Sequence, residues 1–160
     1  MTKKPFSYFE GGITKTIPTK EITIEEYWEL IKSNKNASII HELRNESNPE
    51  IQAKIKSKLN YGTPSGVFSS RKASGLIAHS NIICLDYDGL DLVTETKAQF
   101  VSDENVLLCF ISPRGNGLKV FVSIASENNK ETWIQLNEYF KRVMVILLTL
   151  HQLDCDICAS

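Results

Sequence analysis

The sequence predicts an α/β (α+β) fold in which a helical N-terminal segment precedes a β-α-β-β-α core. Three observations predict it: helix-like apolar spacing before residue 70, apolar runs of strand length after residue 80, and an Asn-Gly pair between two of those runs. With 160 residues, of which 42% are hydrophobic, the chain is long enough for one domain with a buried core and short for two. We therefore expect one domain, with residues 1–70 as its helical N-terminal segment and residues 71–160 as its core.

Helical spacing dominates the N-terminal segment. Thr23 stands three residues before Glu26, which is the spacing of a helix capping box, and apolar residues follow at helical intervals. A second helical stretch is expected over residues 37–44, and a third begins after Pro49. A break that contains Gly and Pro then precedes a short strand over residues 67–71, which leads into a basic turn.

From about residue 75 the pattern alternates regularly between strands and helices. Strands are expected over residues 81–87, 105–112 and 118–124, and helices over residues 92–101 and 129–150. This order is one strand short of the split motif shared by ferredoxin-like and RNA-recognition-motif-like sheets. The missing strand would begin near Ile157, so we expect the sequence to be a fragment of a longer chain, with its core truncated at the C-terminal end.

Composition and cysteine spacing narrow the functional classes. The formal net charge of −1 gives no global electrostatic reason to expect nucleic acid, so any such contact must depend on a local patch. Cys155 and Cys158 form a C-x-x-C pair without a second Cys/His pair at zinc spacing. No apolar signal-peptide core follows Met1, and the longest apolar run, residues 143–150, is far below the roughly 20 residues that a membrane span requires. We expect a soluble cytoplasmic protein that does not cross a membrane.

Two short stretches carry the main chemical signal. The run 82–88 ends in Asp86 and Asp88, whose side chains share one face of a strand because successive residues alternate faces. The stretch 110–122 has the pattern of a strand, a Gly-rich basic turn and a second strand. Two convergent carboxylates beside free backbone N–H groups and basic side chains suit a divalent metal ion and a polyphosphate. Each stretch also has a simpler interpretation, because Asp-x-Asp before Gly89 is common in turns and Asn-Gly is common in hairpins.

Taken together, the two stretches resemble the catalytic core of archaeo-eukaryotic-type primases and primase-polymerases. More narrowly, the chain resembles the VirE amino-terminal domain family of Bacteroidetes mobile-element proteins. The resemblance spans roughly residues 55 to 156. It is carried by Gly66-Val67-Phe68 with Arg71, by the stretches 83–88 and 112–122, and by the acids in residues 153–156.

The resemblance implies metal-binding and catalytic roles for Asp86, Asp88 and Asp154, with Asp156 as the alternative third acid and Mg²⁺ or Mn²⁺ as cofactor. Lys119 stands where the broader superfamily has a histidine; a lysine can hold a phosphate as a point charge, but it cannot shuttle protons near neutral pH. Arg71 can also be explained as part of a solvated basic turn. The residues to which the resemblance assigns nucleotide or phosphate contacts are Arg71, Ser112, Arg114, Gly115, Gly117 and Lys119.

The function that follows from the resemblance is DNA replication or primer synthesis by metal-dependent nucleotidyl transfer, in a mobile-element or phage protein. It implies DNA and nucleoside triphosphates as partners, and a helicase-type ATPase domain nearby in the full-length protein. The alternative is a non-catalytic module that binds DNA or nucleotide. Lys119 and the near-neutral charge favour the module, whereas the retained acids Asp86 and Asp88 favour the enzyme. An interaction domain without a nucleotide site ranks last.

Overall fold

The computed structural model describes residues 4–125, 131–132 and 134–142. Its architecture is α+β, with helices and small antiparallel sheets, as the sequence predicts. The helices are α1 (Ile24–Lys32), α2 (Ala37–Asn45), α3 (Pro49–Lys56) and α4 (Val93–Phe100). The strands are β1 (Phe6–Phe9), β2 (Lys20–Ile22), β3 (Tyr61–Thr63), β4 (Gly66–Phe68), β5 (Leu76–His79), β6 (Ile82–Asp88), β7 (Val106–Ile111) and β8 (Gly117–Ser123).

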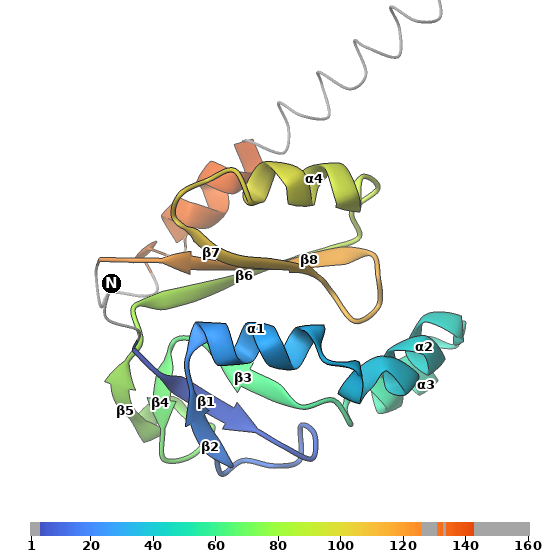
Figure 1. The fold of residues 1–160 in the computed structure, drawn as a ribbon, viewed down its shortest axis with the longest axis horizontal. Coiled ribbons are helices and arrows are strands. Elements are labelled where there is room, and N and C mark those ends of the chain that lie inside the picture. The colour runs from blue at the N-terminus through green and yellow to red at the C-terminus, as the bar shows by residue number, and fades with distance from the viewer. Residues whose placement is uncertain (1–3, 126–130, 133, 143–160) are drawn as a thin grey trace, which may run out of the picture.

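The main sheet is antiparallel, in the order β6-β8-β7, and it separates two layers of the molecule (Figure 1). On one side lie α4 and the helical residues 134–142, and on the other lie α1 and the smaller sheet β2-β1-β3. Each side of the main sheet has its own core. The α4 side buries Leu85, Leu118 and Val120 completely, so side chains fill the centre of this face.

The opposite face is covered only in part. Phe121 of β8 and Phe6 of β1 belong to one core there, and Tyr27 of α1 packs against both of them. The Tyr27 ring lies 5.5 Å from the Phe6 ring and 5.7 Å from the Phe121 ring, measured between centroids. Aromatic pairs at this separation add to the free energy of burial, by about 0.5–1.5 kcal/mol each. The N-terminal elements are therefore fixed against one part of the sheet and leave the remainder of this face open.

The start of α1 confirms the capping box predicted from the sequence. Thr23 is the N-cap; its side-chain oxygen accepts a bond from the Glu26 backbone N–H, and the Glu26 carboxylate accepts one from the Thr23 N–H. Helices α2 and α3 also form where the sequence predicts them, and Asn48 caps α3 in front of Pro49. These local signals were sufficient because each cap satisfies backbone groups within its own turn.

The expectation of a helical segment with one short strand before residue 70 was incomplete. The strand expected over residues 67–71 forms as β4, and three further strands pair in the order β2-β1-β3. Strand β1 has the sequence Phe-Ser-Tyr-Phe, and all four of its residues are buried. A strand that is buried on both faces need not alternate between polar and apolar residues. So short a run therefore lacks the two-residue periodicity by which a strand is recognised in a sequence. Strand β5 also lay outside the prediction.

After residue 80 the observed elements follow the predicted order β-α-β-β, and each of their ends differs from the prediction by one residue. The predicted last helix is present over residues 131–132 and 134–142, and the rest of it lies outside the described residues. The strand predicted near Ile157 also lies outside them. Within the described part of the chain, no helix combines the length and apolar character needed to span a membrane.

Candidate functional site

The pairing of β6 with β8 brings the first predicted site residues together. Asp86 lies directly opposite Lys119 and Asp88 opposite Gly117, so both carboxylates and the lysine share the face of the sheet that faces away from α4. The Lys119 Nζ donates a hydrogen bond to the Asp86 Oδ2 and forms an ion pair with it. The Asp86 side chain is 45% exposed and that of Lys119 is 23% exposed, so a ligand from solvent can compete for either partner.

Gly117 lets the two strands approach closely at this position. A Cβ atom on Gly117 would lie 2.3 Å from the Tyr87 carbonyl oxygen and 3.1 Å from the Asp88 Oδ1. No other residue type fits such a separation without moving the backbone of β6. The glycine therefore has a structural role in the pairing that places Asp86 beside Lys119.

The turn between β7 and β8 is tight and well bonded. The Gly115 N–H donates to the Ser112 carbonyl over 2.9 Å, and the Ser112 N–H donates to the Gly117 carbonyl over 2.7 Å. The loop that follows β6 joins the same turn, because the Leu90 N–H donates to the Asn116 carbonyl over 2.9 Å. The Gly-rich turn and the end of β6 therefore form one connected unit.

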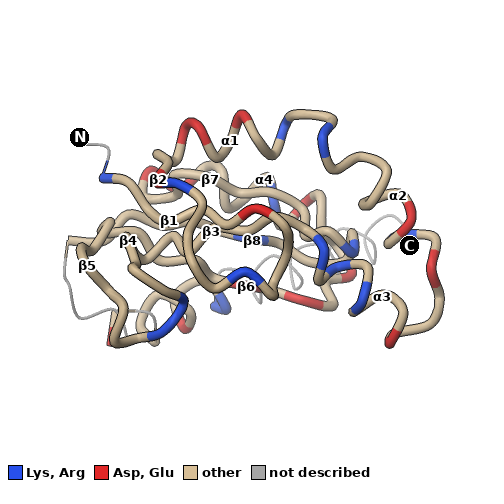
Figure 2. The backbone as a smooth tube through the Cα atoms, turned by 90° about the horizontal axis from the view of Figure 1, so that it is seen from below, with Lys and Arg blue, Asp and Glu red and all other residues tan. Residues whose placement is uncertain are grey.

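A cavity of about 530 Å³ opens on this face, between the main sheet and the N-terminal elements. Four basic side chains line it: Lys56 at the end of α3, Arg71 in the loop after β4, Arg114 in the turn, and Lys119 on β8. Figure 2 shows Lys and Arg positions on several segments of the chain. Lys56, Arg71 and the pair formed by Arg114 and Lys119 are distant from one another in the sequence, and the fold brings them to one place. No Asp or Glu among the described residues lines the cavity. This local excess of positive charge contrasts with the net charge of −1 of the whole chain. We call this space the basic cavity.

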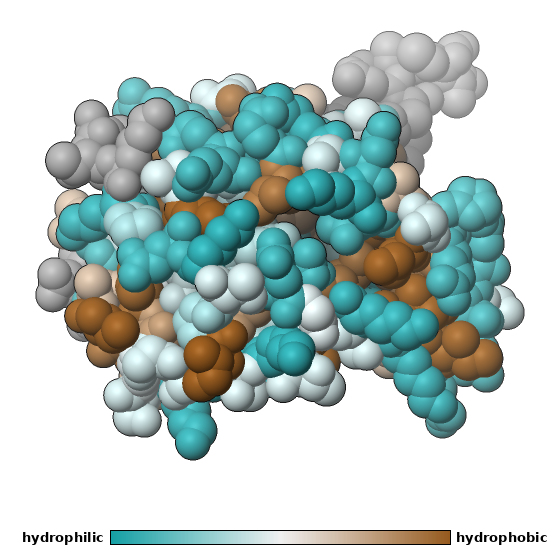
Figure 3. Space-filling model, turned by 60° about the horizontal axis from the view of Figure 1, so that its bottom comes forward, coloured by the Kyte–Doolittle hydropathy of each residue, from teal (hydrophilic) through white to brown (hydrophobic). Residues whose placement is uncertain are grey.

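Aromatic and aliphatic side chains form the rest of the basic cavity. The Tyr61 ring stacks on Phe9 at 4.5 Å with an interplanar angle of 4°, and the Arg71 guanidinium lies 5.4 Å from the Tyr61 ring centroid. Tyr27, Phe110 and Phe121 form the side toward the main sheet. Figure 3 shows hydrophobic surface recessed between the main body and the lobe of α2 and α3, with hydrophilic residues around it. Such a site combines flat apolar surface with positive charge, which suits an aromatic anion.

Two buried polar atoms beside the basic cavity have no hydrogen-bond partner among the described residues. They are the Arg114 Nε and the Ser112 Oγ, and Ser112 is only 1% exposed. Buried polar groups almost always have a partner, and each exception calls for an explanation. A ligand in the basic cavity would supply an acceptor for the Arg114 donor.

Cys84 lies in the wall of the basic cavity, two residues before Asp86 on the same face of β6. Burial raises the pKa of this thiol from 9.0 to about 12; Lys119 lowers that pKa and Asp86 raises it by smaller amounts. The thiol is therefore protonated at neutral pH and is not a nucleophile. Its contribution to the site is apolar surface.

The structure brings some of the predicted residues into one place and leaves others untested. Arg71, Arg114 and Lys119 line the basic cavity, Asp86 pairs with Lys119, and Ser112, Gly115 and Gly117 shape the turn. Asp88 lies on the same face as Asp86 and is exposed. Asp154 and Asp156 lie outside the described residues. Among the residues that are described, no group of three His, Cys, Asp or Glu side chains is placed to hold a metal ion.

Three residues of the site were not recognisable from the sequence. Lys56 appears in the sequence as one of several lysines on a solvated helix face, and Tyr27 as part of the apolar side of a helix. Arg44 is a third: its guanidinium bonds the turn between β7 and β8 from α2. All three come from elements far from the two motifs in sequence, so no local spacing signal could have found them.

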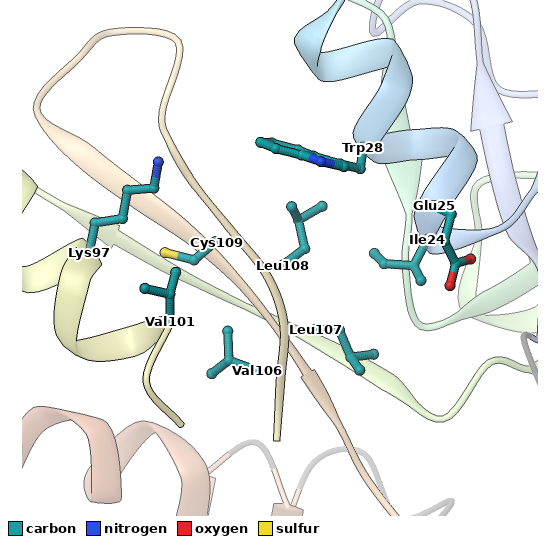
Figure 4. A pocket seen from close by; sticks show the side chains of 9 residues that line it. All are labelled: Ile24, Glu25, Trp28, Lys97, Val101, Val106, Leu107, Leu108 and Cys109. Carbon is teal, nitrogen blue, oxygen red and sulfur yellow. The ribbon is translucent and has the colours of Figure 1, made fainter. Parts of the chain in front are cut away.

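A second hollow, of about 480 Å³, runs beside β7 between α1 and α4 (Figure 4). Its walls are mostly aliphatic, with Trp28 of α1 on one side and Val101 beyond α4 on the other. Lys97 and Glu25 are its two charged residues, so the described lining has no net charge. None of the residues predicted from the sequence to form the site lies in this hollow. The basic cavity is therefore the stronger candidate.

Residues 54–156 match the family described as BT4734-like, N-terminal domain. The match covers more than half of the chain, and the chain therefore belongs to this family. No curated protein and no solved structure matches the chain. The strands and turns that carry Arg71, Asp86, Arg114 and Lys119 lie within the matched residues, whereas α1 and α2 lie before them.

Replacing Cys84 with alanine should change how stability depends on pH. The native thiol keeps its proton up to a pKa of about 12, whereas the unfolded thiol titrates near 9.0. Between these values the native state binds more protons, so the free energy of unfolding falls as pH rises, by up to about 1.4 kcal/mol per pH unit from this one thiol. Urea unfolding at pH 7 and pH 10 should show a larger loss for the wild type than for Cys84→Ala. Equal losses in the two proteins would show that this thiol titrates normally in the folded state.

Proposed function

We propose that the basic cavity binds a nucleoside triphosphate, with its phosphates near Arg114 and Lys119 and its base among the aromatic side chains. The single observation that carries this proposal is the convergence of four basic side chains, without a carboxylate, in one cavity of a chain whose net charge is −1. Phosphate oxygens are strong acceptors for Arg and Lys donors, and a heterocyclic base stacks on aromatic rings. A cavity of about 530 Å³ is within the usual size of small-ligand sites.

We further propose that the domain serves DNA replication or primer synthesis by metal-dependent nucleotidyl transfer. The resemblance to primase-polymerases and to VirE amino-terminal domains supports this, as does the position of Asp86 and Asp88 on the face of the sheet that carries Lys119. These carboxylates are hard oxygen ligands of the type that Mg²⁺ and Mn²⁺ prefer, and Asp154 would be the third acid. A bound metal ion would activate the attacking hydroxyl and stabilise the leaving pyrophosphate. Full-length members would carry a helicase-type ATPase domain and act on DNA.

A non-catalytic module that binds nucleotide or DNA is the second candidate. The ion pair between Asp86 and Lys119 favours it, because the lysine already neutralises one of the two carboxylates that a metal ion would need. In the enzyme, metal and triphosphate would separate this ion pair, because the metal ion would bind Asp86 and the phosphate would bind Lys119. In the module, only the phosphate would bind. The two candidates therefore differ in the role of Asp86.

The Lys119→Ala variant should lose affinity for a nucleoside triphosphate. The change removes one cation from the basic cavity and leaves the Asp86 carboxylate unpaired, so both effects oppose a polyphosphate. We expect roughly tenfold weaker binding, about the effect of one charged hydrogen bond at a half-exposed site. Isothermal titration of wild type, Lys119→Ala and the control Lys141→Ala measures this. Lys141 is exposed and lies on the helical residues 134–142, on the other side of the main sheet. Equal affinities in all three proteins would remove the basic cavity as the nucleotide site.

The Asp86→Asn variant separates the enzyme from the module. Without metal, it should bind triphosphate at least as tightly as the wild type, because Lys119 is released from its ion pair. With millimolar Mn²⁺, the wild type should gain thermal stability from triphosphate, since a ligand that binds only the folded state stabilises it. In the enzyme this metal-dependent gain disappears in Asp86→Asn. A gain that is equal in the two proteins would favour the module.

A further inference from the structure

Arg44 connects the N-terminal helices to the turn between β7 and β8. It lies near the end of α2, before the residues 54–156 that define the family match. Its Nε donates to the Pro113 carbonyl over 3.2 Å, and its Nη2 lies 3.5 Å from the Ser112 carbonyl as a longer second bond. A guanidinium has five N–H donors in a rigid plane, so it can hold two neighbouring carbonyl groups at once. The turn is thus tied to an element that is distant in the sequence.

Gly115 leaves room for this guanidinium. Its φ angle is +90°, and a Cβ at this position would lie 3.3 Å from the Arg44 Nε and 3.7 Å from the Cζ. The Arg44 side chain therefore lies in contact with the turn itself. The guanidinium lies on the side of the turn toward which the Ser112 and Pro113 carbonyls point.

The bond to Pro113 also fixes the direction of the next backbone N–H. The described chain has no cis peptide bond, and in a trans peptide the carbonyl and the N–H point in opposite directions. Because the Pro113 carbonyl points toward Arg44, the Arg114 N–H points away from it. Among the described residues, no backbone carbonyl accepts a hydrogen bond from that N–H.

The positions of the two arginines indicate where that N–H is directed. Pro113 lines both the basic cavity and a neighbouring hollow of about 400 Å³. Arg44 lines only the neighbouring hollow, and Arg114 lines only the basic cavity. The Pro113 carbonyl therefore points toward the arginine that lines the neighbouring hollow, whereas the residue after this peptide, Arg114, lines the basic cavity.

We infer that Arg44 is a positioning residue, which holds the turn so that the Arg114 N–H faces the basic cavity and can bind a phosphate oxygen there. This inference rests on the proposed function for the identity of the ligand, but the orientation of the turn is a property of the free protein. Free backbone N–H groups beside a glycine turn form anion sites, and their affinity depends on how well the turn is held. The second helix of the N-terminal segment thereby contributes to the site without touching the ligand.

The experiment compares Arg44→Ala and Arg44→Lys with the control Arg142→Ala, which removes an exposed arginine on the other side of the main sheet. Arg44 is itself exposed, so these variants should fold. In the free proteins, hydrogen exchange of the Ser112 and Gly115 amides, which are hydrogen-bonded within the turn, should be several-fold faster in Arg44→Ala than in the wild type and the control. Inorganic triphosphate should bind roughly tenfold more weakly to Arg44→Ala, and Arg44→Lys should recover little, because a lysine cannot bond two carbonyl groups in one plane.

Rescue by millimolar guanidinium chloride tests whether the guanidinium group itself holds the turn. The ion should bind in the space vacated in Arg44→Ala, slow the exchange of the turn amides again and restore triphosphate affinity, while leaving Arg142→Ala unchanged. Unaltered amide exchange in Arg44→Ala overturns the inference. So does faster exchange with unaltered triphosphate affinity. If the wild type binds no triphosphate, the proposed function fails, and the amide exchange of the free proteins still decides whether Arg44 holds the turn.

Discussion

The register between β6 and β8 is the constraint on which the rest of the site depends. It places Asp86 opposite Lys119 and Asp88 opposite Gly117, while Leu85 lies buried on the α4 side. A slip of one residue would move the two carboxylates into the core and expose the apolar set, at a cost of several kcal/mol. The fully buried face therefore determines which side chains reach the open face. The chemistry of the site is a consequence of core packing on its other side.

The open face exists because the N-terminal elements cover only part of the sheet. Tyr27 contacts aromatic rings of both the small sheet and the main sheet, and it fixes the separation between them. Beyond this contact lies the basic cavity, with Arg114 and Lys119 contributed by the main sheet and its turn and with Lys56 and Arg71 contributed by the segments before β6. The cavity therefore needs both the segments before β6 and the main sheet. Some of its lining, such as Tyr27, precedes residue 54, where the family match begins.

Sequence patterns predicted those features that are local or periodic. The capping box at Thr23, the alternation that places Asp86 and Asp88 on one face, and the hairpin at Asn116 each depend on a few neighbouring residues. Strands β1, β2 and β3 were missed because they are three or four residues long and all four side chains of β1 are buried. Arg44 and the aromatic walls of the cavity were also missed, because they meet the turn only through tertiary packing. Asp154 stays a prediction, since it lies outside the described residues.

The account depends most directly on where a nucleoside triphosphate binds, and chemical-shift mapping by two-dimensional NMR tests this point on the whole chain. Titration with the triphosphate should shift the amides of residues 113–119 and of Arg71, together with the side-chain Nζ signal of Lys119 as it exchanges Asp86 for a phosphate. The amides of α4 should remain unchanged, because this helix lies on the side of the main sheet opposite to the basic cavity. Shifts confined to the hollow between α1 and α4, with no change at Lys119, would contradict the account.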